Sequence, residues 1–507
     1  MPQSKNLIFL NVFSGAGKTV IISALAIISI PIALSYWGET TYGFVVLINS
    51  LLAYLSMSAL GIDAAASILM NKAKTDAIKK NILIRSVKLT VLFVVITLSV
   101  FLLIDDIYPD WINIIGDIDS KITLAKQSGF VLILFFILNM VFKLISAGFC
   151  GFHKPYYESV FQTFTAIGNF FVLLFVVYFK LSLLDYAYLL GGTNLVQNII
   201  KMVFFYTSTY KRVTICCDST ESDTFGNKKI LSLGLQCLLG TVAALIINNT
   251  DNIVISKMLG IEQVSTYSVV FKVYTILFSI IFILNSSITP ILGKSIADKS
   301  IQDVKELYFK TFYLILGFTG FSVGSINFFL PDLLYFWANI EVDYLLICIF
   351  SAFAFFFSIT NLNNIITNAF NYVSSTIPIL IFEAILNIVL SVYLSTVMGV
   401  VGVALATLIS TFFGSFIFFP IVIYYKTDKK IKFPLKDFLS FFQFIIVPFY
   451  TSSILVNLFE LNFYLKVCGY LLSVFFYAFF IYRYFPKIEF QRVLKLFLFK
   501  QSKKKYK

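Results

Sequence analysis

Long apolar runs alternate with short polar segments along the whole chain. Charge-free runs of about 20 residues recur, from Thr19–Gly38 to the longer run Tyr344–Phe382, and about 20 apolar residues are enough for one helix to cross a bilayer. The pattern predicts about fourteen transmembrane helices, near residues 13–37, 42–61, 87–104, 128–149, 157–179, 185–206, 231–256, 265–292, 310–331, 344–369, 374–396, 400–425, 438–458 and 463–482. We therefore expect an all-α polytopic membrane protein.

The composition supports this class. Hydrophobic residues make up 59% of the 507 positions and charged residues 13%, whereas soluble domains average about 25% charged residues. This balance excludes a soluble globular protein, a disordered chain and a soluble enzyme with one membrane anchor.

The basic residues predict the orientation of the chain in the membrane. Thirty of the 39 lysines and arginines fall in alternate loops and at the two ends of the chain. Because positive residues are retained on the cytoplasmic side, both termini are predicted to be cytoplasmic. The net charge of +13 is thus a topology signal, and no nucleic-acid partner is expected.

An internal repeat is indicated by residues that recur at one offset. Gly38 pairs with Gly260 and Asn139 with Asn361, each 222 positions apart. Such a duplication predicts two six-helix bundles related by a pseudo-two-fold axis along the membrane normal. We expect an N-terminal bundle at 1–229, a second bundle at 230–425, and two additional C-terminal helices with a basic tail at 426–507.

Charged residues inside the predicted spans are candidates for function, because burying a charge in a bilayer is costly. Lys18, Lys143 and Lys272 are predicted to line a cavity, with the alternative that each extends to the membrane surface or pairs with a carboxylate for assembly. Asp251 and Glu383 are the candidate carboxylates for ion coupling. Lys201 lies near a span end, where simple anchoring at the membrane surface is favoured.

Amide side chains form polar stripes on several predicted helices. Asn139 shares a helical face with Lys143, and amides hydrogen-bond hydroxyl groups well, which suits a sugar. Hydrogen bonds between helices are the competing interpretation. Together with Asn139, the amides predicted to line a cavity are Asn248, Asn361, Asn364 and Asn368.

No catalytic, metal or cofactor site is predicted. The chain has one histidine, and its six cysteines are scattered without a C-x-x-C pair, so neither a zinc site nor a Ser–His–Asp triad can be assembled from the pattern. The segment Ser14–Thr19 ends like a phosphate-binding P-loop, but valine occupies position 12, where that motif needs glycine.

Two segments resemble a known family. Pro31–Gly43 reads PIALSYWGETTYG and Asn249–Tyr267 reads NTDNIVISKMLGIEQVSTY. Each has a helix ending near glycine, a short acidic loop and a tyrosine that begins the next helix. Together with the 6 + 6 + 2 layout, they are similar to the polysaccharide repeat-unit flippases (Wzx type, as in O-antigen synthesis) of the multidrug/oligosaccharidyl-lipid/polysaccharide (MOP) exporter superfamily.

This resemblance implies a MATE-like fold and a function. The protein would move a polyprenyl-diphosphate-linked oligosaccharide from the cytoplasmic to the outer leaflet of the bacterial plasma (inner) membrane, for O-antigen or capsule synthesis, by alternating access. The implied partners are this lipid-linked sugar, the lipid bilayer, a proton or sodium ion, and a polysaccharide polymerase with its chain-length regulator. The family often carries cavity arginines, and no predicted span interior here has one.

Two alternatives remain open from the sequence. A multidrug or cation antiporter of the same superfamily would share the fold, but twelve helices and cavity carboxylates would be expected. A membrane polysaccharide polymerase is an enzyme, and a large outer loop with Arg or His would be expected. The longest predicted outer loop, about Asp105–Gln127, contains neither.

Overall fold

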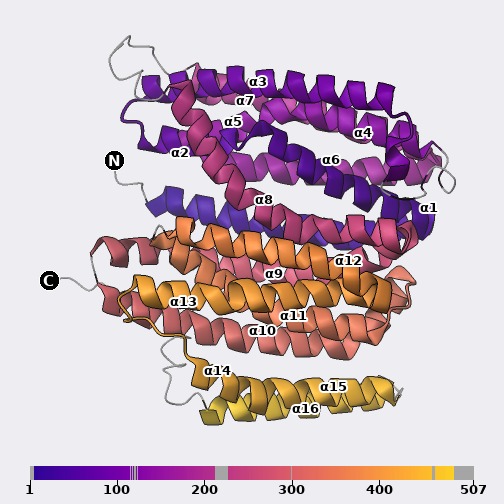
Figure 1. Ribbon diagram of the computed structural model, residues 1–507, viewed down its shortest axis with the longest axis vertical. Helices are drawn as coiled ribbons and strands as arrows, with labels where there is room; N and C mark the ends of the chain where they lie inside the picture. The colour runs from indigo at the N-terminus through magenta and orange to yellow at the C-terminus, as the bar shows by residue number, and fades with distance from the viewer. Residues whose placement is uncertain are drawn as a thin grey trace. The chain divides into compact units, whose positions relative to one another are not determined.

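We describe the fold from a computed structural model of the chain. The structure describes residues 5–484 except 115, 117, 119–121, 123, 212–225, 299, 371 and 460–462. Within these residues the regular elements are helices (Figure 1).

The first half of the chain contains long helices interrupted by short turns of tighter or wider helix. They are α1 (Lys5–Leu55), η1 (Ser56–Ala59), α2 (Ile62–Lys72), α3 (Asp76–Ile107), η2 (Trp111–Ile114), α4 (Ala125–Asn139), η3 (Met140–Phe142), α5 (Lys143–Gly151), α6 (Pro155–Phe179), α7 (Leu183–Phe205), η4 (Tyr206–Tyr210) and α8 (Asn227–Met258).

The second half continues in the same way. Its elements are α9 (Ile261–Ala297), α10 (Ile301–Ala338), α11 (Tyr344–Ala369), α12 (Val373–Thr411), η6 (Phe412–Phe416), α13 (Ile417–Lys426), α14 (Leu435–Phe441), η7 (Phe442–Ile446), α15 (Val447–Leu458) and α16 (Phe463–Tyr484).

Each of the fourteen predicted ranges falls on helix, which confirms the all-α polytopic fold. Helix α11 has the predicted bounds. Nine segments of the described residues are long and apolar enough to cross a membrane. Two of these, Phe13–Ala59 and Ser375–Lys426, each contain two predicted spans joined at a kink.

Glycine makes these kinks possible. Gly38 inside α1 has φ 72° and Gly399 inside α12 has φ 61°, a region that other residues enter only with strain. Gly260, between α8 and α9, also has a positive φ, of 100°. The predicted repeat partners Gly38 and Gly260 therefore share both a place between consecutive predicted spans and a left-handed backbone.

The chain forms two compact units. Unit 1 consists of Met1–Val269 and Ala384–Ala406. In it α2 packs against both α5 and α8, and glycines allow the closest approach. A Cβ atom on Gly61 would lie 2.5 Å from the carbonyl oxygen of Gly234, so only glycine fits at this crossing.

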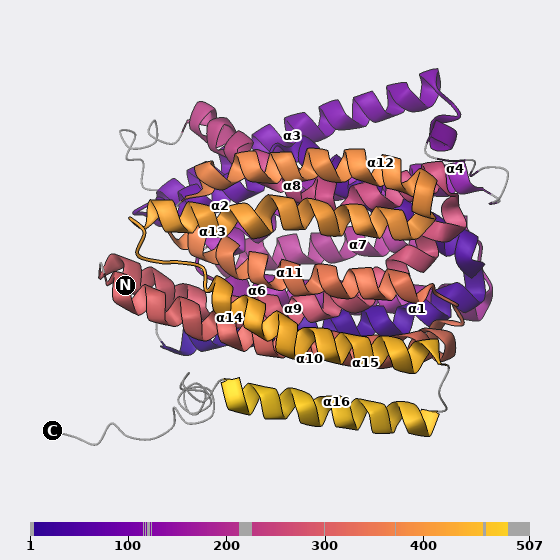
Figure 2. The same cartoon turned by 60° about the horizontal axis from the view of Figure 1, so that its bottom comes forward.

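Unit 2 consists of Val270–Glu383 and Thr407–Lys507. Helices α15 and α16 pack along α10 (Figure 2), where Gly320 and Gly324 leave room for the side chains of Ile446 and Phe449. The Lys466 ammonium of α16 donates to both carboxylate oxygens of Asp332 on α10, at 2.8 and 3.0 Å. The two C-terminal helices are therefore an integral part of unit 2.

The units do not follow the predicted bundle limits, since α8 and part of α12 pack within unit 1. The predicted division at 1–229, 230–425 and 426–507 concerns the repeat, and it stays a prediction.

Substituting Gly324→Ala should destabilise unit 2, because the new methyl group would overlap the Phe449 ring. Overpacking of this kind costs about 1–3 kcal/mol. Gly317→Ala is the matched control on the same helix, since nothing lies within 4 Å of its Cβ position. Thermal unfolding of the purified variants should show a lower midpoint for Gly324→Ala only, and equal midpoints would contradict this packing.

Candidate cationic cavity

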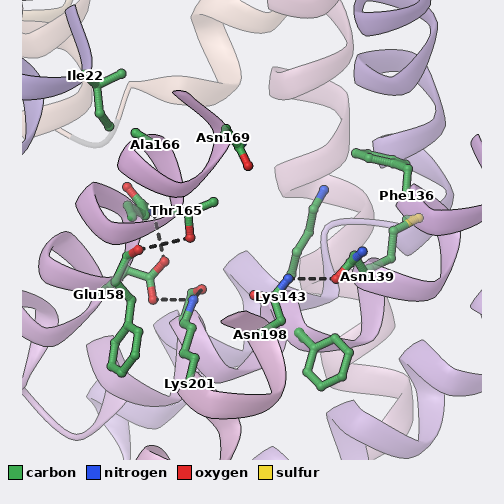
Figure 3. A pocket seen from close by; sticks show the side chains of 15 residues that line it. Ile22, Phe136, Asn139, Lys143, Glu158, Thr165, Ala166, Asn169, Asn198 and Lys201 are labelled. Carbon is green, nitrogen blue, oxygen red and sulfur yellow. Dashed lines mark hydrogen bonds and ion pairs between the residues drawn. The ribbon is translucent and has the colours of Figure 1, made fainter. Parts of the chain in front are cut away.

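A cavity of about 480 Å³ that is lined by both apolar and polar side chains lies in unit 1 (Figure 3). Its walls come from α1, α4, η3, α5, α6 and α7. The residues that line it are Ile22, Phe136, Asn139, Met140, Phe142, Lys143, Ser146, Glu158, Phe161, Gln162, Thr165, Ala166, Asn169, Asn198 and Lys201.

One polar face of α6 forms a side of the cavity. Glu158, Gln162, Thr165 and Asn169 follow one another at helical spacing and all line it. The Asn169 carbonyl oxygen Oδ1 is buried and accepts no hydrogen bond from the described residues. This face therefore presents a row of groups suited to hydroxyl and amide partners.

A buried ion pair joins this row to α7. The Lys201 ammonium, on a side chain that is about 9% exposed, lies 2.6 Å from Glu158 Oε2 and donates to Ser146 Oγ at 2.7 Å. The other Glu158 oxygen accepts from Gln162 Nε2 at 2.8 Å. The charge of Lys201 is thus balanced inside the protein.

Lys143 begins α5 and has a different environment. Among the described residues its ammonium donates no hydrogen bond and has no carboxylate within 4 Å, and the dashed line beside its label in Figure 3 joins Asn198 to Asn139. Its recorded contact is the face of the Phe136 ring, 5.4 Å from the ring centre. The Asp63 carboxylate on α2 acts on this ammonium electrostatically but makes no ion pair within 4 Å, so Lys143 can pair directly with an anion in the cavity.

Lys18 lies at the edge of the same cavity. Its ammonium donates to Gln162 Oε1 at 3.0 Å, and this amide in turn donates to Glu158. The region therefore brings together three lysines and one glutamate on α1, α5, α6 and α7, an excess of positive charge that favours an anionic ligand.

The predicted amide Asn139 also lines the cavity. Its Oδ1 accepts from Asn198 Nδ2 at 2.8 Å, while its own Nδ2 donates to the Phe135 carbonyl. Asn139 thus links α4 to α7 and presents part of its amide to the cavity, so both interpretations of the amide stripe apply to it.

Four of the predicted cavity residues lie in unit 2, and none of them lines the cavity of unit 1: Lys272, Asn361, Asn364 and Asn368. Lys272 on α9 is exposed. Asn361 on α11 is buried and accepts from Asn285 Nδ2 at 2.7 Å, a bond between two helices. Asn364 is partly exposed, and it accepts from the exposed Asn368 at 3.3 Å.

Asp251 is a buried carboxylate of unit 1. Its side chain accepts a hydrogen bond from the Tyr267 hydroxyl at 2.5 Å and from the Ser391 hydroxyl at 3.4 Å. Asn248, one turn earlier on α8, has a side chain outside the described residues.

Glu383 is the buried carboxylate of unit 2, and it caps a break in a helix. Its oxygens accept from the Thr411 hydroxyl at 3.0 Å and the Ser415 backbone N–H at 2.9 Å. Both donors adjoin or lie in η6, a wide turn whose Gly414 departs from helical angles. No described lysine or arginine lies within 4 Å of Glu383.

Sequence reasoning missed two charged members of the cavity. Lys201 and Glu158 lie near the ends of their predicted spans, where extension to the surface is the ordinary expectation. The spacing of Glu158, Gln162, Thr165 and Asn169 on one face of α6 is a signal that could have found Glu158. No such signal marks Lys201.

Comparison with known proteins places the chain in a family. The family model described as polysaccharide biosynthesis protein matches residues 9–296, and the model MatE matches residues 237–397. Among curated proteins, none matches the chain.

Several solved structures share the fold. The lipid II flippase MurJ in its inward closed conformation has a TM-score of 0.69 and 14% identity, with 94% of this chain and 99% of that chain covered. An inward-facing multidrug resistance MATE family transporter of the MOP superfamily has a TM-score of 0.67 and 14% identity, covering 83% and 99%.

A MOP superfamily transporter from Pyrococcus furiosus also shares the fold, with a TM-score of 0.60, 14% identity, and 85% and 100% covered. Its description states that a reversed polarity of the binding pocket suggests a different function. Because the polysaccharide biosynthesis model matches more than half of the sequence, this chain belongs to that family.

Proposed function

We propose that the protein is a flippase that moves a polyprenyl-diphosphate-linked oligosaccharide from the cytoplasmic to the outer leaflet of a bacterial plasma membrane. The observation that carries this proposal is the cavity of unit 1, where an unpaired Lys143 lies among amides, close to Lys18 and Lys201. The expected role of the product is in surface polysaccharide synthesis, such as O-antigen or capsule.

The charge of the cavity suits the diphosphate. Two opposite unit charges 4 Å apart attract by about 4 kcal/mol at an effective dielectric constant of 20. Charge-assisted hydrogen bonds from lysine to phosphate add direction to this attraction. In this proposal Lys143 makes the first contact with the diphosphate, because, unlike Lys201, it does not have to break an ion pair with a carboxylate.

The uncharged part of the cavity suits the sugar. Thr165, Asn169 and Asn198 supply hydroxyl and amide groups beside the lysines, and such groups donate to and accept from sugar hydroxyls. A cavity of this size is within the usual range for small-molecule sites, about 300–1,000 Å³. It would hold the diphosphate with the sugar next to it, and the polyprenyl tail would stay in lipid.

Transport would follow alternating access, in which the cavity opens to one side of the membrane and then to the other. A proton or sodium gradient is the proposed drive, with Asp251 and Glu383 as the candidate coupling carboxylates. Their burial supports this role, since a carboxylate in such surroundings changes its interactions strongly when it gains or loses a cation.

The proposal includes a location and partners. Both termini would lie in the cytoplasm, by the distribution of lysine and arginine. A polysaccharide polymerase and its chain-length regulator would receive the lipid-linked unit at the outer leaflet.

One alternative has support of its own. The MatE match and the MATE transporter fold suit a multidrug or cation antiporter. The excess of lysine over carboxylate in the cavity disfavours a cationic drug. A polysaccharide polymerase is the candidate from a different class, and the families matched here consist of transporters.

Deletion of the gene should trap complete lipid-linked repeat units on the cytoplasmic leaflet and remove the surface polymer. The measurement is the leaflet distribution of extracted lipid-linked oligosaccharide, alongside surface polysaccharide. Single units that reach the outer leaflet would indicate a polymerase instead. Normal glycan with altered drug sensitivity would indicate the antiporter.

Lys143→Met should weaken binding of a prenyl diphosphate by about ten- to a hundred-fold, since hydrogen bonds to charged groups contribute roughly 1.5–3 kcal/mol. Titration of the purified chain with farnesyl diphosphate measures this. Lys72→Met, at an exposed position that ends α2, is the control and should bind as the parent does. Equal affinities for the two variants would contradict the proposal that this cavity binds the diphosphate.

Asp251→Asn and Glu383→Gln, made together, should uncouple transport from the ion gradient. Each replacement keeps the shape and removes the charge. The rate of flipping in proteoliposomes, with and without a proton or sodium gradient, measures the effect. Transport that keeps its full gradient dependence would show that neither carboxylate couples.

A further inference from the structure

The ion pair of Lys201 and Glu158 raises a question that the proposed function leaves open. Both side chains line the same cavity as Lys143. One Glu158 oxygen pairs with Lys201 and the other accepts from Gln162. The Lys201 ammonium also donates to Ser146. One of the three lysines is therefore already occupied by an anion of the protein itself.

Stability alone is a weak reason for this pair. Removing two charges from water costs several kcal/mol for each ion, and the attraction between them often does no more than offset that cost. Apolar side chains would pack α6 against α7 at least as well. The pair lies where an anionic ligand would lie, which points to a role in binding.

Resting on the proposed function, we propose that Glu158 is an internal competitor for the diphosphate: it holds Lys201 while the cavity is empty and yields it to a phosphate when cargo enters. Lys143 and Lys18 capture the anion first. Lys201 then exchanges one anionic partner for another, so its positive charge stays paired throughout.

The contacts of Glu158 and Gln162 support such an exchange. The Glu158 carboxylate keeps Gln162 as a partner after it leaves Lys201, and Gln162 also contacts Lys18. The amide thus links the competitor to the lysine at the cavity edge. A carboxylate without that second partner would be left uncompensated and would resist displacement.

This competition would set the balance between binding and release. A carboxylate that remains beside the bound diphosphate repels it and competes for the same ammonium, which weakens the complex. When the cavity opens to the outer side, Glu158 retakes Lys201 and helps expel the anion. Without Glu158 the cargo would bind tightly and leave slowly.

The experiment is a titration of the full chain in lipid nanodiscs with farnesyl diphosphate. Glu158→Gln should bind this probe about tenfold more tightly than the parent, which equals about 1.4 kcal/mol. In proteoliposomes the same variant should show a lower half-saturating concentration and a lower maximal rate. Glu306→Gln removes the carboxylate of an exposed pair with Lys310 on α10 and should change neither.

Two further variants separate competition from simple repulsion. Glu158→Asp keeps the charge but draws it back from Lys201, so it should raise affinity several-fold, whereas a mere repulsive charge would leave affinity unchanged. In a Lys201→Met background, Glu158→Gln should give a much smaller gain than in the parent. An equal gain in both backgrounds would overturn the proposal.

The outcomes also distinguish a failure of the competitor role of Glu158 from a failure of the proposed function. Thermal unfolding shows whether Glu158→Gln is folded. If this folded variant binds no more tightly than the parent while Lys143→Met weakens binding, the competitor role is wrong, and the cavity is still the anion site. If the Glu158→Gln variant does not fold, the affinity of Glu158→Asp is the test: a several-fold gain supports the competitor role, and an unchanged affinity contradicts it. If Lys143→Met leaves the affinity unchanged, the cavity itself is not the anion site.

Discussion

The cost of holding charge in a low-dielectric, membrane-spanning protein governs the arrangement of the interior. The charged side chains of the described interior meet this cost in different ways. Lys466 pairs with Asp332, and Glu383 accepts hydrogen bonds where a helix breaks. Lys143 has neither an ion pair within 4 Å nor a hydrogen bond among the described residues; its ammonium faces the Phe136 ring, and it lines the cavity of unit 1. We propose that this ammonium is what makes the cavity suit an anion.

This constraint links the fold to the proposed chemistry. The cavity requires polar faces on α5, α6 and α7 to meet, and the packing of unit 1 brings them together. Close contacts elsewhere in the unit, such as the crossing of α2 and α8 at Gly61 and Gly234, help to fix the helices. The matched solved structures, at 14% identity, support the fold alone. The case for a lipid-diphosphate cargo rests on this chain's own lysines and amides.

Much of the fold is predictable from the sequence, because apolar runs of a set length have few alternatives in a membrane. The limits of α11 agree to the residue, and Gly38 and Gly260, paired by their spacing, both have a positive φ. The cavity is less predictable. Asn361 and Asn139 are paired by the repeat and each bonds an asparagine of another helix, yet only Asn139 lines the cavity of unit 1. Which face of a helix meets a cavity depends on packing between distant segments, and a residue near a span end, such as Lys201, can either extend to the surface or turn inward.

The central claim is that the cavity of unit 1 holds the diphosphate of a lipid-linked sugar. The most direct measurement is a structure of the chain in lipid nanodiscs with a bound polyprenyl-diphosphate-linked sugar. The account predicts diphosphate density within hydrogen-bond distance of the Lys143 ammonium, with the first sugar against the amides of α6 and α7. Density for the diphosphate at a place away from Lys143, Lys18 and Lys201 would contradict it.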